Sequence, residues 1–95
     1  MQYIAVEWIH SLPDEPILLY SEIDEDRWER RKIELFRDGS AGFADEEHED
    51  KQTGLSLEPW PSLEEIAADP QFVPKLIGKE VFERLWKAHA SKSDS

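Results

Sequence analysis

The sequence contains no cysteine and no long apolar segment, and both absences restrict the possible functions. Without cysteine the chain has no disulfide framework and no thiolate that could act as a nucleophile or a metal ligand. No apolar run approaches the roughly 18 residues that a membrane-spanning helix needs. The first ten residues lack a basic start and include Glu7, which is not typical of a signal peptide. We therefore expect a soluble, cytoplasmic protein.

Basic residues are also scarce, and the excess of acids is concentrated in two segments. The chain has 22 acids and 11 lysines and arginines, with a net charge of −11. Residues 1–26 contain seven acids and no base, and residues 39–70 contain nine acids and one base. A field of this sign repels nucleic acids and anionic membranes and attracts basic proteins. An acidic surface that serves only solubility is an equally good interpretation at this stage.

Motifs for catalysis or for cofactor binding are absent from the sequence. There is no phosphate-binding loop, dinucleotide fingerprint or nucleophile elbow. His10, His48 and His89 fall in three different predicted elements, although a zinc site needs its ligands clustered. The acids around His48 could bind a hard cation weakly, but adjacent side chains of an extended loop diverge. We expect no cofactor, no metal and no catalytic residue, and hence a protein that is not an enzyme.

The first half of the sequence has the alternating pattern of β-strands. Strands are predicted in "QYIAVEWIH" and "ILLYSEI", and the loop "SLPDEP" between them is too short for a parallel crossover. Two further strands meet at Asp38-Gly39, a strong hairpin signal. A three-residue loop with Gly39 in the left-handed region pairs Leu35 with Ala41 and Ile33 with Phe43, which builds one apolar face. A two-residue loop would not, so the longer loop is favoured.

The second half changes to a helical period after a long acidic loop. Ser62 and Glu65 form a capping-box pattern that predicts a short helix ending at Asp69-Pro70. A main helix is predicted within "PKLIGKEVFERLWKAHA", with Gly78 as its cap and Ile77 packing against Phe82. The predicted fold is a single α+β domain over residues 1–90. It has an antiparallel sheet of about four strands in the chain order ββββαα, with the C-terminal helices packed on one face and a frayed polar tail at 91–95.

Two details of the predicted sheet remain open. The register of the third strand around Arg27–Arg31 is not fixed by the sequence, and a bulge there is one solution. The second face of the sheet is expected to carry Tyr3, Tyr20, Phe36 and Glu22 as an outward aromatic and acidic surface, which is the composition of a binding face. The alternative is an ordinary solvated face with weak cross-strand ion pairs. The four tryptophans are assigned to the core.

Several motifs in this order resemble a known family. They are "WIH", "PDEP", "LYSEID", "RWERRKIELFRDG", "TGLS", "PSLEEI", "DPQFVP" and "FERLW". Between about Tyr3 and Trp86 the chain resembles a family of short, acidic bacterial proteins that is described as a domain of unknown function. The resemblance implies a bacterial setting and assigns no catalytic or binding residue. Families of this size and charge include suspected toxin-neutralising immunity proteins.

The function that we expect from these observations is non-catalytic binding of a basic protein, in its sharpest form as an immunity protein against a nuclease-like toxin. An alternative is a small enzyme or ligand-binding protein that uses the sheet face near His10, Glu7 and Tyr20. A DNA mimic is a third possibility. The residues expected to contact a protein partner are Asp14, Glu15, Glu22, Asp24, Asp26, Tyr20, Phe36, Glu46, Glu47 and Glu49. The acids up to Asp26 and those of the loop from Asp45 to Asp50 form two clusters, and either cluster could steer the partner.

Overall fold

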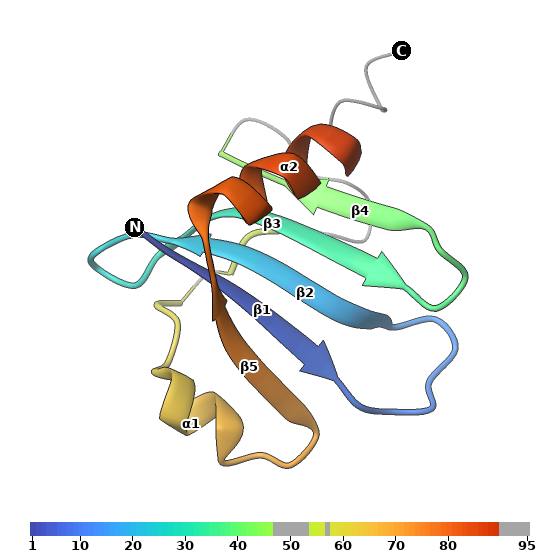
Figure 1. The fold of residues 1–95 in the computed structure, drawn as a ribbon. Helices are drawn as coiled ribbons and strands as arrows, with labels where there is room; N and C mark the ends of the chain where they lie inside the picture. Colours follow the sequence, from blue (N-terminus) through green and yellow to red (C-terminus); the bar gives the residue numbers. More distant parts are fainter. Residues whose placement is uncertain (47–53, 57, 90–95) are drawn as a thin grey trace.

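The computed structural model describes residues 1–46, 54–56 and 58–89, which form one antiparallel sheet and two helices (Figure 1). The sheet has five strands in the order β4-β3-β2-β1-β5. The predicted α+β class and antiparallel sheet are confirmed, with five strands instead of about four. In chain order the elements are β1 (Gln2–Trp8), β2 (Pro16–Ile23), β3 (Glu29–Phe36), β4 (Ala41–Ala44), α1 (Leu63–Ala67), β5 (Phe72–Ile77) and α2 (Lys79–His89).

The hairpin between β3 and β4 has the predicted three-residue loop. Leu35 pairs with Ala41 and Ile33 pairs with Phe43. Gly39 has a φ angle of +90°, in the left-handed region that glycine adopts without steric cost. This register places the apolar residues of both strands on the same face, as the sequence predicts.

The start of β3 contains an irregularity that resolves the open register. Glu22 pairs with Arg31, but the next residue of β2, Ile23, pairs with Glu29, so Arg30 is the extra residue of a bulge. Without it, Glu29 and Arg31 would point to the same face, because alternate residues of a strand do so. The bulge sends Glu29 to the face of Ile23 and leaves Arg31 on the opposite face.

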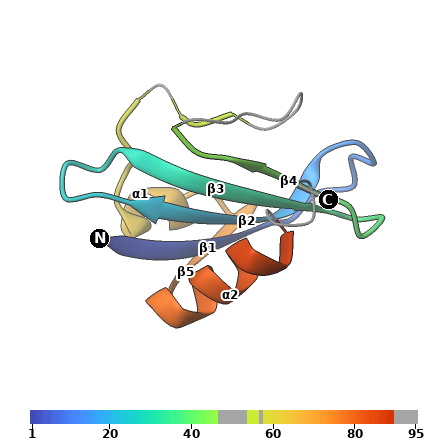
Figure 2. The ribbon, with the colours of Figure 1, turned by 90° about the horizontal axis from the view of Figure 1, so that it is seen from above.

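Each face of the sheet is covered by a different helix, so the prediction that both helices pack on one face is wrong (Figure 2). On the first face, Tyr3 and Ile33 pack with Phe82 of α2. On the second face, Ile4, Val6 and Ile23 form a separate buried cluster, against which α1 packs Leu63 and Ile66. Both faces of β1 are apolar, which is consistent with a sheet that is covered on both sides but does not indicate which helix covers which face.

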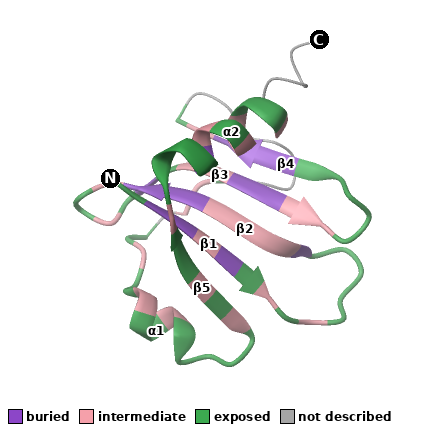
Figure 3. Cartoon of the chain, in the orientation of Figure 1, coloured by how far each residue is buried: buried purple, intermediate pink, exposed green. Residues whose placement is uncertain are grey.

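Strand β5 was not predicted, because Pro74 interrupts its pattern and its sequence continues into the main helix. The amide of Ile9 donates to the carbonyl of Gln71 at 2.7 Å, and in this register the backbone groups of alternate residues, 71, 73, 75 and 77, are directed towards β1. Pro74 therefore faces the open edge, where its missing N–H costs no ladder hydrogen bond. Figure 3 shows that β5 is mostly exposed or half-buried. Ile77 belongs to this strand and not to the helix.

The two helices begin where the sequence predicts. The Ser62 side chain accepts a hydrogen bond from the Glu65 amide at 3.2 Å, and the carbonyl of Gly78 accepts from the Phe82 amide at 3.2 Å. Phe82 is fully buried, whereas the preceding apolar residue, Val81, is 45% exposed. The predicted tail at 91–95 lies outside the described residues.

Candidate functional site

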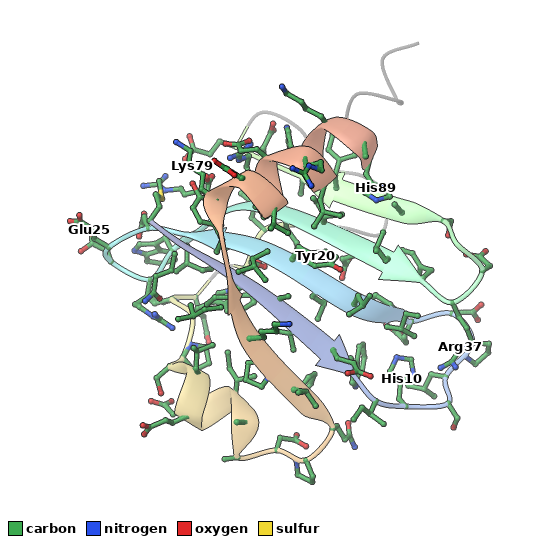
Figure 4. The ribbon with its side chains drawn as sticks, viewed as in Figure 1. His10, Tyr20, Glu25, Arg37, Lys79 and His89 are labelled. Atoms are coloured by element: carbon green, nitrogen blue, oxygen red, sulfur yellow. The ribbon has the colours of Figure 1, made fainter. Side chains whose placement is uncertain are left out.

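The predicted acidic residues divide between opposite ends of the sheet. Asp14 and Glu15 lie in the loop between β1 and β2, whereas Asp24 and Asp26 lie in the turn between β2 and β3. The 8 residues of β2 separate the two groups by about 26 Å, at roughly 3.3 Å per residue. Figure 4 shows Glu25, in the same turn, at the far end of the sheet from the β1–β2 loop. The fold therefore divides the first predicted acidic cluster between the two ends of the sheet.

Glu22 is buried beneath α2, where Arg31 binds it. Arg31 donates to the two carboxylate oxygens of Glu22 at 2.9 and 2.7 Å and to those of Glu83, in α2, both at 2.9 Å. The guanidinium carbon lies 4.9 Å from the centroid of the Phe82 ring and 5.1 Å from that of the Trp86 ring. One arginine thus joins β2, β3 and α2. Glu22 is part of the core, which corrects its predicted place on an outward surface.

The groups of this network hold one another in fixed ionisation states. Hydrogen bonds from Arg31 lower the pKa of Glu22 and of Glu83, and the two carboxylates raise the pKa of Arg31. Burial raises the pKa of the Tyr3 hydroxyl, and the hydrogen bond to Glu22 acts in the same direction. None of these shifts brings a group towards neutral pH, so the network is suited to holding α2 on the sheet and not to acid–base chemistry.

Asp24 organises the turn between β2 and β3. Its Oδ1 accepts from the amides of Asp26 and Trp28, both at 2.9 Å, and its Oδ2 accepts from Nε of Arg30 at 2.8 Å. The hydrogen bond from the Trp28 amide is the main reason that the pKa of Asp24 is lowered. Arg30 also binds Glu46, just after β4. Asp24 and Glu46, both predicted as partner-binding residues, are therefore both in salt bridges with Arg30.

A hollow of about 660 Å³ lies beside this pair of salt bridges. Asp45 and Glu46 line it together with the Asp24 carboxylate, and Arg30 and Arg31 balance part of their charge. The fold thus brings together acids that are more than twenty positions apart in the sequence. Glu47 and Glu49, which were predicted to belong to the same group, lie outside the described residues, as does His48.

Other exposed acids have no ion pair within the described parts of the chain. In the two connections at the ends of β2 these are Asp14, Glu15, Glu25 and Asp26. The same holds for Glu58 and for Glu64 and Glu65 in the first turn of α1, where negative charge also suits the helix dipole. The acids of α1 were not predicted as binding residues, although they lie in the acidic half of the sequence.

The predicted aromatic surface does not form. Tyr3 is buried and Tyr20 half-buried on the face that α2 covers, where both pack in the cluster around Ile33. Phe36 follows Leu35 in β3 and so points to the opposite face of the sheet. The three aromatic residues therefore do not share an outward face.

The three residues of the alternative enzyme or ligand site, His10, Glu7 and Tyr20, do not lie together either. Glu7 and His10 line a hollow of about 470 Å³ at the end of β1, while Tyr20 lies under α2. Nδ1 of His10 accepts from the Leu12 amide at 3.0 Å, so its proton is on Nε2, which donates to the Pro16 carbonyl at 2.7 Å. Both ring nitrogens are thus used to hold the β1–β2 loop, which is a structural task.

The sequence interpretation missed an apolar hollow between α1 and the sheet. Its volume is about 380 Å³, and its walls include Trp60, Ile66 and Phe72. Glu65 and Asp69 lie at the same hollow. The available signal was the segment "EPWPSLEEI", in which one tryptophan stands between two prolines and next to acids. Trp60 is half-buried and packs against the cluster of Ile4, Val6 and Ile23, so its predicted place in the core is only part of its environment.

Within residues 1–46, 54–56 and 58–89, no three or more His, Cys, Asp or Glu side chains are grouped so as to hold a metal ion. In the same part of the chain, no helix combines the length and apolar character required to cross a membrane.

Comparison with known proteins identifies a family but no characterised relative. The model of a family described as "Domain of unknown function (DUF6881)" matches residues 2–91. No curated protein and no solved structure matches the chain.

Proposed function

The chain belongs to the DUF6881 family of unknown function, and we propose that it is a non-catalytic acidic domain that binds a basic protein. The sharpest form of the proposal is a bacterial immunity protein that neutralises a nuclease-like toxin in the cytoplasm. Such a protein has to be attracted to a basic cleft and to cover it, which requires exposed carboxylates and no catalytic group.

The supporting observation is that the arginines of the sheet and its loops are engaged within the fold. Arg27 donates to the carbonyls of residues 60 and 61 and to Gln2, and Arg37 donates to the carbonyl of His10 at 2.7 Å. Arg30 and Arg31 bind carboxylates, as described above. Within the described residues, none of these four arginines forms an ion pair with the exposed acids Asp14, Glu15, Glu25 and Asp26 or with those of α1.

Unneutralised charge of one sign has an energetic consequence. The exposed acids repel one another in the free protein, and a basic partner would relieve this repulsion while increasing the rate of encounter. Steering of this kind is strongest at low salt and weakens as the screening length falls to about 8 Å at physiological ionic strength. An acidic surface that serves solubility alone would show no partner with these properties.

The test is to capture a partner from the native host and to measure its association rate. We expect a basic protein, bound in a defined ratio, whose association rate falls steeply with salt. Two charge-matched variants separate the ends of the sheet, Asp14→Asn with Glu15→Gln, and Glu25→Gln with Asp26→Asn. One of them should slow association at least about tenfold at low salt, with an unchanged melting temperature. A non-basic partner, or salt-insensitive association that neither variant alters, would contradict the proposal.

A further inference from the structure

The apolar hollow beside α1 is a gap in the cover of the second face of the sheet. Helix α1 has only 5 residues, and the half-buried side chains of Ile66, Trp60 and Phe72 surround the hollow without filling it. Val6 and Leu19 of the sheet form its floor. A volume of about 380 Å³ is at the lower end of the range for ligand pockets, which is suited to an apolar side chain rather than to a large cofactor.

The rim of the hollow is held in place by Arg27. The amide of Trp60 donates to the carbonyl of Arg27 at 2.7 Å, and Nε of Arg27 donates back to the carbonyl of Trp60 at 3.2 Å. The same guanidinium binds the Pro61 carbonyl and Oε1 of Gln2. Arg27 itself has a φ angle of 72°, which a non-glycine residue keeps only where its contacts determine it. A rim fixed in this way loses little entropy when a ligand binds.

The chain segment around the hollow is acidic, and Arg27 at its rim is directed to backbone carbonyls and to Gln2 rather than to a carboxylate. From Gly54 to Gln71 the sequence contains four acids and no base. Glu65 and Asp69 line the hollow directly. The Glu65 carboxylate has no hydrogen-bond or ion-pair partner within the described residues, while that of Asp69 accepts only the Gln71 amide, at 3.0 Å. An apolar floor with unneutralised carboxylates at its mouth is complementary to an apolar group that has positive charge beside it.

We propose that this hollow anchors the protein partner by taking up an apolar side chain that is flanked by lysine or arginine in the partner. The inference rests on the proposed function, because both require a basic partner, but it adds the place and the mode of contact. The buried apolar side chain supplies the affinity and lowers the dissociation rate. The carboxylates of Glu65 and Asp69 select partners with adjacent positive charge.

Three synthetic peptides of equal length test the proposal with the intact chain. The first has two leucines flanked on each side by two lysines, the second has serines in place of the leucines, and the third has glutamates in place of the lysines. Backbone amide shifts in nuclear magnetic resonance spectra locate each peptide and give its affinity. We expect the first peptide to shift the amides of Ile66 and Phe72, and the affinity to fall at least about tenfold for each of the other two.

Matched variants assign the effect to the rim. Glu65→Gln with Asp69→Asn should weaken binding of the leucine–lysine peptide several-fold, whereas Asp14→Asn with Glu15→Gln removes the same charge elsewhere and should leave it unchanged. Both variants are expected to keep the melting temperature of the parent. Equal binding of the leucine and serine peptides, or shifts confined to the turns at the ends of β2, would overturn the anchor. The proposed function would still stand in that case, since partner capture and its salt dependence decide it separately.

Discussion

Replacement of Arg31 by methionine should destabilise the domain by about 3–5 kcal/mol at neutral pH, because it removes one partner of a buried ion pair. The side chain of Glu22 is only 10% exposed and would remain without its cation. Methionine retains apolar contact with the rings of Phe82 and Trp86, so the loss reports mainly on charge. The total stability of a 95-residue domain is roughly 5–14 kcal/mol, at about 0.05–0.15 kcal/mol per residue. The variant should therefore be severely weakened.

The pH dependence separates the ionic contribution from packing. Hydrogen bonds from Arg31 lower the pKa of Glu22 and of Glu83 below the ordinary value of 4.5. Their stabilising effect is fully present above that value and is lost as the pH falls through the folded-state pKa values. In the Arg31→Met variant, burial instead raises the pKa of Glu22, so this carboxyl is protonated more readily. The cost of burying an unpaired carboxylate therefore becomes smaller in acid. The difference between parent and variant should be largest near pH 7 and smaller near pH 4.

Urea denaturation at about pH 7 and pH 4 measures this difference. A control is Glu83→Gln, which removes the more exposed partner and leaves the pair of Arg31 with Glu22 intact, so it should cost less than Arg31→Met. Equal destabilisation by Arg31→Met at both pH values would refute the ionic interpretation. It would indicate that α2 is held on the sheet by its apolar contacts alone.

Three further changes test other parts of the fold. Gly39→Val should lower the free energy of unfolding by at least about 1 kcal/mol, whereas Ser40→Val should leave it nearly unchanged. The space around Gly39 is open, with nothing within 4 Å of an added Cβ, so only its positive φ angle opposes the change. Equal urea midpoints for Gly39→Val and the parent would contradict this prediction. Glu29→Ala should lower the free energy of unfolding by about 1–3 kcal/mol for each hydrogen bond lost. The buried Glu29 carboxylate accepts from Ser21 Oγ at 2.6 Å and from the Ser56 amide at 2.8 Å. In thermal melts, Glu29→Gln should be more stable than Glu29→Ala, because its side-chain oxygen can still accept a hydrogen bond. Pro74→Val should restore an outward amide on β5 and promote self-association, and a variant that stays monomeric at high concentration in sedimentation experiments would contradict the protective role of the proline.

Local features of the fold were predictable because short-range geometry determines them. The loop at Gly39 follows from the choice of the register that gathers Ile33 and Phe43 on one face, and the structure has that register. The cap at Ser62 follows from the need to satisfy the first amides of a helix. Neither conclusion depends on what covers the sheet.

The assignment of faces was not predictable, because it depends on packing between distant segments. Tyr3 and Ile4 are adjacent, apolar and both buried, so alternation alone cannot indicate which side is solvated. Strand β5 lies at an edge, where burial is partial and a proline is tolerated, so its pattern is weak. The consequence for function is direct, because α2 covers Tyr3 and Tyr20, which were expected on an outward aromatic surface, and the hollow beside Trp60 was overlooked.

The bulge at Arg30 decides which acids remain available to a partner. In a regular strand, Glu29 and Arg31 would share a face, and Glu29 would compete with Glu22 and Glu83 for the guanidinium. The bulge instead directs Glu29 to Ser21 on the other face, Arg31 to the carboxylates under α2, and Arg30 to the exposed turn. Three consecutive charged residues thus act in three separate places. Acids within reach of these two arginines are neutralised, and the acids of the β1–β2 loop and of α1 are not. A charge count cannot distinguish the two groups, whereas the register of one strand can, and it moves the expected contact surface towards α1 and the ends of β2.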